Sequence, residues 1–299
     1  MTSQTVALQW LGRCTVRALY AEVALEPKPG LVSFRDCGSH TDMTAATFVR
    51  SLFALRHYFL ATARAGFAGA AFATLENLGR SAEGCMLLAT DGVNTHRGAV
   101  FGLGLLCASA GHLVALDRPI TAHHVRQALT HQWGDALMRR AAVARARAPT
   151  SHGQRAAHRF GLRTAGDEAA LGFPTLFDTT LPVLQNACKA GASPRAAKVQ
   201  ALFATMAVLD DTNVAHRGGR SGLELVRRKA QQFLKNGGIW HPDWLSQARA
   251  IHADLVAHRI SPGGSADVLA GACWLQMVTT NEVAPPEPML QRALGQASA

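Results

Sequence analysis

The chain has 299 residues, of which 48% are hydrophobic, and its 30 Lys and Arg against 20 Asp and Glu give a formal charge of +10. This hydrophobic content is enough for a sizeable core and argues against a disordered chain. Alanine, leucine and arginine are plentiful, whereas aromatic and β-branched residues are few, which favours helices over sheets. The positive charge favours anionic partners such as nucleotides, nucleic acids or acidic lipids.

The first segment predicts an amphipathic helix rather than a signal peptide, because Arg13 and Arg17 interrupt its apolar residues. The next helix is predicted by a stripe at helical spacing, made of Phe48, Leu52, Leu55 and Phe59. The apolar run 98–116 approaches membrane-spanning length, but it contains Ser109, His112 and several glycines, so we expect a buried helix. A later stripe consists of Leu223, Val226, Ala230, Phe233 and Leu234.

Helix starts are indicated by Thr121 after Pro119 and by Ser193 before Pro194, where the hydroxyl caps the helix. No segment alternates polar and apolar residues for long enough to predict a strand, and none has the composition of an interdomain linker. The sequence therefore predicts an all-α protein of about ten helices in a single globular domain over residues 1–299.

The six cysteines form no CxxC pair and no metal-like spacing, which indicates reduced, mostly buried thiols in a cytoplasmic protein. The densest basic clusters are "RRAAVARAR" from Arg139 and "RRK" from Arg227. Such clusters are typical of solvated helix faces, whereas single-strand binders also interleave aromatic residues, which are missing here. We therefore expect no nucleic-acid partner and no membrane partner.

Two polar segments share one pattern, D-x-x-N followed by H-R-G. Its residues are Asp91, Asn94, His96, Arg97 and Gly98 in the first segment, and Asp210, Asn213, His216, Arg217 and Gly218 in the second. The pattern is an internal pseudo-repeat, a pair of loops that converge on one ligand, or a chance match. Dense polar groups beside a rigid helical frame are typical of functional loops.

Asp210, Asp211 and Asn213 offer the hard oxygen ligands that Mg²⁺ accepts while it keeps waters and bridges to phosphates. If this segment is helical, Asp210 and Asn213 share a face and Asp211 points elsewhere. One acid could then hold the metal while its neighbour accepts a proton. The alternative is that the two acids cap helices and bind arginines.

The glycine-containing segment "SPGGSAD" presents backbone N–H groups ahead of a helix start, with Ser261 or Ser265 as the cap. It predicts either an anion site or a plain turn. His40 and Asp42 follow "KPGLV", in which prolines hold Lys28 in an extended segment. A single lysine or histidine more often lies on the surface or satisfies a polar group in the core. Walker A, GxGxxG and HExxH motifs are missing, which argues against P-loop, Rossmann and zinc-protease sites.

Seven motifs occur in a fixed order along the chain. They are "EPKPGLV…GSHTDM", "DGVNTHRGAVFGLGLLC", "SHGQRA", "GDEAALGFP", "LPVL", "LDDTNVAHRGG" and "ISPGGSADVLAG". Together they resemble the motifs of the triphosphoribosyl-dephospho-CoA synthases, which make the prosthetic-group precursor of citrate lyase and malonate decarboxylase. The resemblance runs from about residue 10 to about residue 275. No role is carried over at four positions where the sequence departs from the family pattern, Ser33, Arg35, Asp36 and Asp167.

The resemblance implies an all-helical transferase that joins ATP to 3′-dephospho-CoA, releases adenine and forms 2′-(5″-triphosphoribosyl)-3′-dephospho-CoA. It also implies Mg²⁺ bound with ATP and transfer of the product to an acyl-carrier-protein holo-synthase. The sequence leaves the oligomeric state open, with a homodimer as one alternative. A second hypothesis is a Mg²⁺-dependent N-ribosyl hydrolase, because "DDTN" is similar to the magnesium-binding acids of helical ADP-ribosyl hydrolases. The two hypotheses differ in whether adenine release requires dephospho-CoA.

The implied reaction breaks the bond between ribose C1′ and adenine N9, through a transition state that resembles an oxocarbenium ion. Asp210 or Asp211 is then the candidate general base, and His96 or His216 the candidate donor to adenine. The candidate metal ligands are Asp91, Asp210 and Asp211. The candidate substrate-binding residues are Lys28, His40, Asp42, Asn94, Arg97, Glu168, Asn213, Arg217, Ser261, Gly263, Gly264, Ser265 and Asp267. Those expected to hold phosphates are Lys28, Arg97, Arg217 and the loop 261–265.

Overall fold

The computed structural model describes residues 2–280, and every regular element in that range is a helix. The α-helices are α1 (Ser3–Val23), α2 (Ala45–Phe67), α3 (Phe72–Ala89), α4 (Arg97–Ala115), α5 (Ala122–Ala146), α6 (His152–Phe160), α7 (Ala165–Ala170), α8 (Leu181–Lys189), α9 (Pro194–Val208), α10 (Thr212–Lys235), α11 (Trp244–Ala257) and α12 (Gly263–Thr279). A π-helical turn, η1 (Thr175–Thr180), precedes α8, and a 3₁₀ turn, η2 (Gly238–Trp240), follows α10. The all-α prediction is confirmed, with twelve α-helices in the described range where about ten were expected.

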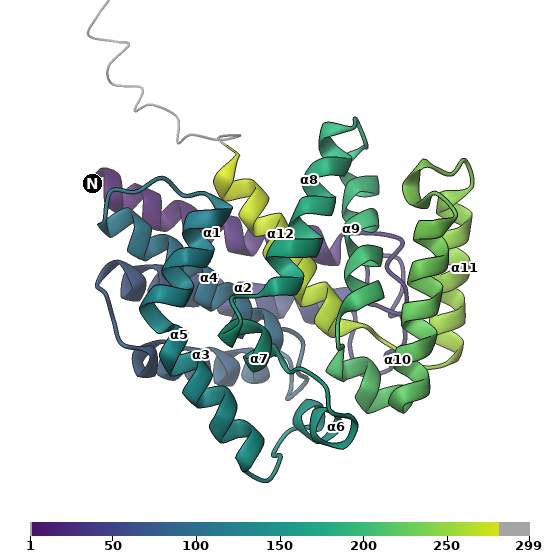
Figure 1. Cartoon of the computed structure of the whole chain (residues 1–299), viewed down its shortest axis with the longest axis horizontal. Coiled ribbons are helices and arrows are strands. Elements are labelled where there is room, and N and C mark those ends of the chain that lie inside the picture. Colours follow the sequence, from purple (N-terminus) through teal and green to yellow (C-terminus); the bar gives the residue numbers. More distant parts are fainter. Residues whose placement is uncertain (1, 281–299) are drawn as a thin grey trace, which may run out of the picture.

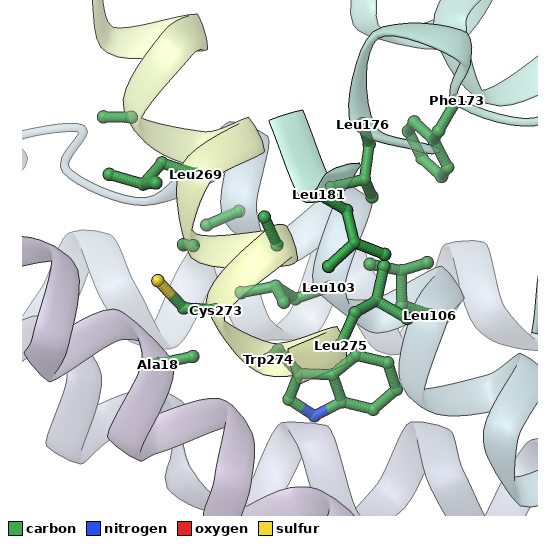
Figure 2. Packing of buried hydrophobic residues seen from close by; sticks show 14 of the residues in the cluster. Ala18, Leu103, Leu106, Phe173, Leu176, Leu181, Leu269, Cys273, Trp274 and Leu275 are labelled. Atoms are coloured by element: carbon green, nitrogen blue, oxygen red, sulfur yellow. The ribbon is translucent and has the colours of Figure 1, made fainter. Parts of the chain in front are cut away.

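Helix α12 lies in the middle of the molecule, between α1 to α5 on one side and α8 to α11 on the other (Figure 1). It packs against α1, α4, α8 and α9. Trp274 is completely enclosed, and its Nε1 donates to the carbonyl oxygen of Leu11 at 3.2 Å. Figure 2 shows Ala18 of α1 near Cys273 of α12, with Leu103 of α4 close to the same helix. The core is therefore built around the last described helix.

Helix α4 is apolar along its length and crosses α2 at close range. A methyl group built on Gly66 of α2 would lie 1.9 Å from the carbonyl oxygen of Ala108, and one built on Gly111 of α4 would lie 2.0 Å from that of Ala63. Glycine at both positions allows the two backbones to touch. By length and composition α4 is the one described helix that could cross a membrane, but 67% of that stretch is buried inside the protein. The expected buried helix is confirmed.

Two of the predicted helix caps are confirmed, and a third is wrong. The Thr121 hydroxyl accepts from the His124 N–H at 3.1 Å, and the Ser193 hydroxyl accepts from the Ala196 N–H at 3.3 Å. The predicted serine cap of α12 is wrong, because Pro262 is the N-cap residue and it makes no side-chain cap hydrogen bond. The first turn of α12 thus keeps backbone N–H groups for other partners.

The apolar stripes predicted from helical spacing face the core. Their buried members are Leu52, Leu55, Phe59, Leu223, Val226, Ala230 and Phe233. All six cysteines are free, and Cys14, Cys107 and Cys273 are buried, whereas Cys85 is exposed. The basic clusters on α5 and α10 lie largely on exposed faces, as expected for solvated clusters.

Helix α10 begins at Thr212 with Asp211 as its N-cap, so Asp210 precedes the helix. The helical arrangement of Asp210 and Asn213 considered above is therefore wrong. Gly219 interrupts α10 with a φ of +63°, a conformation that favours glycine. Because this break directly follows the second H-R-G segment, the segment lies within the first turns of α10.

Candidate functional site

The N-terminal turns of α12 contact both H-R-G segments. A methyl group built on Gly264 would lie 3.1 Å from the Asp211 carboxylate, and one built on Gly98 would lie 2.0 Å from Asp267 Oδ2. Glycine at these two positions lets one carboxylate approach α12 and another approach α4. Among the interpretations of the repeated pattern, the structure supports two segments that converge on one place.

Asp211 joins α10 to α12 through both of its carboxylate oxygens. Oδ1 accepts from the N–H groups of Asn213 (3.0 Å) and Val214 (3.3 Å), and Oδ2 accepts from the N–H (2.8 Å) and hydroxyl (3.1 Å) of Ser265. Burial raises the pKa of Asp211, while these donors lower it. With four donors in place, Asp211 has little capacity left for a metal ion or a substrate proton.

Asp267, in the second turn of α12, directs its carboxyl group at the first turn of α4. Besides its close approach to Gly98, it accepts a hydrogen bond from the Ala99 N–H. Burial raises the pKa of Asp267 well above its ordinary value, and the nearby carboxylates of Glu22 and Asp211 raise it further, against the opposing effect of the Ala99 N–H. Asp267 therefore keeps its proton to higher pH than an ordinary aspartate.

Glu22 and Lys28 form a buried ion pair near Asp267. The distance from Lys28 Nζ to Glu22 Oε1 is 2.5 Å, and both side chains are almost fully enclosed. Burial lowers the pKa of Lys28, while Glu22 raises it. Sequence reasoning missed Glu22, although it continues the buried face of α1 at helical spacing from Thr15 and Ala18. A charged residue on such a face is a signal of function, because it is seldom buried without a partner.

His96 is buried and presents a polar atom without a partner. Its Nδ1 lies 2.6 Å from Ser51 Oγ, which accepts from Thr95 Oγ1 at 2.8 Å. Ser51 Oγ can donate its own proton to His96 Nδ1, an arrangement that places the imidazole proton on Nε2. This buried Nε2 has no hydrogen-bond partner. Burial, and then the charge of Lys28, lowers the pKa of His96 to about 3, so the ring is neutral at pH 7.

These five residues form what we term the acid centre: Glu22, Lys28, His96, Asp211 and Asp267. A cavity of about 170 Å³ reaches Lys28 from the loop after α1. Its lining also carries Arg35 and Arg249, which both pair with Glu26, and His252, which lies 3.3 Å from Asp36. The lining is therefore of mixed charge.

The loop between α1 and α2 is held against the start of α12 by other predicted residues. His40 Nε2 lies 2.8 Å from the Ser261 hydroxyl, and Arg217 donates to His40 Nδ1 at 3.0 Å. Arg217 also donates to the carbonyl oxygen of Ser39 at 3.1 Å. Burial and Arg217 lower the pKa of His40, and the exposed Asp42 at 3.4 Å raises it. These contacts order the loop that carries Lys28.

The predicted metal ligands do not form one site. Asp91 is 89% exposed and lies 3.6 Å from Arg50. Asp210 is paired with Arg227 and accepts from a backbone N–H at 3.0 Å. Within residues 2–280, no group of three or more His, Cys, Asp or Glu side chains is placed to hold a metal ion. The structure therefore does not gather Asp91, Asp210 and Asp211, because each carboxylate has its own partners.

Several other candidates lie at exposed positions. Asn94 accepts from the Arg97 N–H at 3.2 Å at the start of α4, and the Arg97 guanidinium lies 3.1 Å from Glu83. The His216 ring is exposed, with its centroid 4.2 Å from that of His152, and desolvation and His152 lower its pKa. Of the two histidines predicted to donate to adenine, only His96 belongs to the acid centre.

Glu168 and Asn213 also lie outside the acid centre. Glu168 is buried, where Oε2 accepts from the Thr175 N–H at 3.0 Å and Oε1 lies 3.4 Å from Arg163. Asn213 is exposed, and a methyl group built on Gly263 would lie 2.9 Å from its Nδ2. Glu168 thus fixes the start of η1, while Asn213 lies against the start of α12.

The fold and the acid centre define a class, an all-helical enzyme whose buried acid, imidazole and ammonium groups suit transfer of a charged group. Residues 8–285 match the family described as ATP:dephospho-CoA triphosphoribosyl transferase (CitG), and the chain belongs to this family. It is similar to a probable 2-(5″-triphosphoribosyl)-3′-dephosphocoenzyme-A synthase of Acinetobacter calcoaceticus, with 40% identity over 253 residues, or 84% of this chain and 85% of the relative. No solved structure matches the chain.

The chain is therefore a transferase that forms 2′-(5″-triphosphoribosyl)-3′-dephospho-CoA from ATP and dephospho-CoA. The predicted family and activity are confirmed, and the hydrolase hypothesis loses its support. Transfer of the product to an acyl-carrier-protein holo-synthase, the homodimer and the cytoplasmic location stay predictions.

Proposed function

We propose that the triphosphoribosyl group is transferred at the acid centre, with Asp267 as the group that moves the proton. The 2′-hydroxyl oxygen of dephospho-CoA forms a bond to ribose C1′ of ATP, and the bond from C1′ to adenine N9 breaks. The hydroxyl loses one proton and adenine gains one, so the reaction is balanced. The observation that supports this proposal is the Asp267 carboxyl group, held with its raised pKa against the start of α4.

A single carboxyl group of this kind can serve both proton transfers. Protonated Asp267 donates to a ring nitrogen of the departing adenine, and the resulting carboxylate takes the proton of the 2′-hydroxyl. His96 Nε2–H donates a hydrogen bond to the base as negative charge develops on it. Asp211 holds α10 against α12. The proposed general base is thus Asp267 in place of Asp210 or Asp211, whose carboxylate oxygens already accept hydrogen bonds.

Mg²⁺ enters this proposal with ATP, as the ion that neutralises the triphosphate. Mg²⁺ commonly keeps several waters and takes one or two protein carboxylates besides substrate phosphates. Asp91 fits this use because its carboxylate is 89% exposed and its ion pair with Arg50 is long, at 3.6 Å, whereas Asp210 is closely paired with Arg227. Asp91 would hold the ion together with the side-chain oxygen of Asn94.

Removal of Mg²⁺ with EDTA is expected to abolish product formation, because the charge of the triphosphate is left unneutralised. Mass spectrometry of a reaction with ATP and 3′-dephospho-CoA should detect the product and free adenine only when Mg²⁺ is present. Asp91→Asn should raise the Mg²⁺ concentration for half-maximal activity about 10-fold, which corresponds to about 1.4 kcal/mol.

Asp117→Asn is the matched control, because Asp117 is another exposed aspartate with a positive φ after a helix end. Its Mg²⁺ requirement should equal that of the wild-type protein. An unchanged requirement in Asp91→Asn would remove Asp91 from the proposal. Formation of ADP or AMP in place of free adenine would contradict the transfer itself.

Arg97→Ala is expected to raise the KM for ATP about 10-fold with a smaller change in kcat, because a half-exposed guanidinium at the start of α4 is lost as a phosphate ligand. Glu83→Gln should have the opposite effect on KM, since it releases Arg97 from its ion pair. Steady-state kinetics with ATP as the varied substrate measures both, and Arg64→Ala on the exposed end of α2 is the control. An unchanged KM in Arg97→Ala would exclude Arg97 as a phosphate ligand.

A further inference from the structure

A second cavity, of about 260 Å³, lies between α2, α3, α4 and α5 and is separate from the acid centre. Three aromatic residues line it, Tyr58 from α2, Phe72 from α3 and Phe101 from α4. Gly79 of α3 and Gly104 of α4 also line it. We term this cavity the aromatic slot.

The floor and one wall of the aromatic slot are fixed by the protein itself. The Tyr58 hydroxyl donates to the carbonyl oxygen of Val100 at 3.0 Å, so its ring is anchored beside α4. A methyl group built on Gly79 would lie 3.6 Å from the same hydroxyl oxygen, which leaves the space above Gly79 free of side-chain atoms at closer range. The Arg140 guanidinium lies over the Phe101 ring, 5.1 Å from its centroid. The slot thus combines aromatic faces with a planar cation.

The rim of the aromatic slot carries two arginines and two carboxylates, Arg80, Arg140, Glu76 and Glu83. Glu76 lies 3.2 Å from Arg140 and 3.5 Å from Arg80. Glu83 lies 3.1 Å from Arg97, which is outside the lining. Carboxylates can accept from an exocyclic amino group, and the arginines can meet phosphate oxygens.

Helix α4 connects the aromatic slot to the acid centre. Gly98 faces Asp267, and Val100, Phe101 and Gly104 line the slot on the same helix. At about 1.5 Å per residue, these positions lie roughly 3 to 9 Å along the helix axis from Gly98. The slot therefore lies beside the same first turns of α4 that contact Asp267.

We propose that the aromatic slot binds the adenine ring of 3′-dephospho-CoA, because the proposed function places the departing adenine of ATP against Asp267 and His96, which do not line the slot. The slot is smaller than the roughly 300 to 1,000 Å³ of most small-molecule sites, so it suits one ring system rather than a whole dinucleotide. Its aromatic walls can stack on a purine, and the rim carboxylates can accept from the adenine amino group. This inference rests on the proposed function, and because both substrates contain adenine, the experiment compares the two.

Gly79→Leu tests the proposal, because the new side chain grows from α3 into the slot. The matched control is Gly84→Leu on the same helix, where a methyl group has no neighbour within 4 Å. Isothermal titration should give the Kd of ATP and of 3′-dephospho-CoA for each variant. The base-free counterparts, ribose 5-triphosphate and 4′-phosphopantetheine, are titrated in parallel.

We expect Gly79→Leu to weaken binding of 3′-dephospho-CoA at least 10-fold, while ATP and 4′-phosphopantetheine bind as they do to the wild-type protein. Gly84→Leu should bind all four probes normally. Weaker binding of ATP in place of 3′-dephospho-CoA would overturn the proposal. Unchanged binding of both, or weaker binding of 4′-phosphopantetheine or ribose 5-triphosphate, would overturn the proposal.

A second variant guards against a folding defect in Gly79→Leu. Phe101→Ala enlarges the slot and removes one stacking face, so it should weaken the same substrate while thermal unfolding shows a folded protein. If Phe101→Ala binds both substrates normally, the proposal fails. The proposed function fails in a different way, when the wild-type protein releases no adenine from ATP and 3′-dephospho-CoA.

Discussion

Asp267→Asn is expected to lower the rate of adenine release by roughly 10²- to 10⁴-fold, the usual contribution of a positioned acid–base group. Asparagine has nearly the size of the protonated acid, so it keeps the contact with Gly98 and the bond from the Ala99 N–H, but it cannot exchange a proton. The measurement is single-turnover release of adenine at saturating ATP and 3′-dephospho-CoA, so that changes in affinity do not enter.

The same variant should be more stable than the wild-type protein at neutral pH. Folded Asp267 binds its proton more tightly than the unfolded chain, because burial and the neighbouring carboxylates raise its pKa. The free energy of unfolding therefore falls as the pH rises from the ordinary carboxyl pKa of about 3.9 toward the raised value. Asparagine does not titrate, so the variant does not lose this free energy as the pH rises. The melting temperatures of the wild-type protein and of Asp267→Asn should therefore coincide at about pH 3 and separate at higher pH.

Asp254→Asn is the control, and its effect on stability at neutral pH should have the opposite sign. A hydrogen bond from Lys229, at 2.7 Å, lowers the pKa of Asp254, so the wild-type carboxylate contributes stability above the unfolded pKa. Its replacement should lower the melting temperature slightly at neutral pH and leave adenine release unchanged. Wild-type turnover in Asp267→Asn would remove Asp267 from the chemistry, and a lower melting temperature at neutral pH would contradict its raised pKa.

Asp211→Ala is expected to lower the free energy of unfolding by about 3 to 5 kcal/mol, because four donors lose their acceptor and α10 loses its N-cap. Two of these donors belong to Ser265, so the contact between α10 and α12 is lost together with the cap. Urea denaturation followed by circular dichroism measures the change.

Asp243→Ala is the matched control, because Asp243 is the N-cap residue of α11 but its side chain caps no backbone N–H. Its effect should stay within about 0.5 kcal/mol. Asp211→Asn distinguishes a structural role from a catalytic one. If Asp211 were the general base, this variant would lose activity while its stability stayed unchanged, and that result would restore Asp211 as the base. We expect the variant to lose stability instead.

The helices and several of their starts could be predicted from the sequence because they depend on local patterns. Thr121 and Ser193 cap their helices through residues three positions away, and the stripe ending at Phe59 needs only helical spacing. The polar motifs contain His96 and Asp267, which the structure places in the acid centre. Their roles in the reaction stay predictions.

Their roles depend on contacts that no local pattern encodes. Gly98 and Asp267 are neighbours only because α12 packs across the start of α4, and the proton position on His96 depends on Ser51 of α2. Asp211 was expected to be a metal ligand or base, but Ser265 occupies one of its oxygens. The aromatic slot combines four helices, so its residues carry no common signal in the sequence.

The central position of α12 also bears on how the protein is made. The indole of Trp274 bonds to the backbone at Leu11, 263 positions earlier, and Asp267 lies on the same helix. A ribosome must therefore translate most of the gene before α1 and α4, which already pack against α2, obtain α12 as their last partner. A nascent chain that stalls earlier leaves the α12-facing sides of α1 and α4 uncovered and lacks Asp267, so no residual turnover is expected from it.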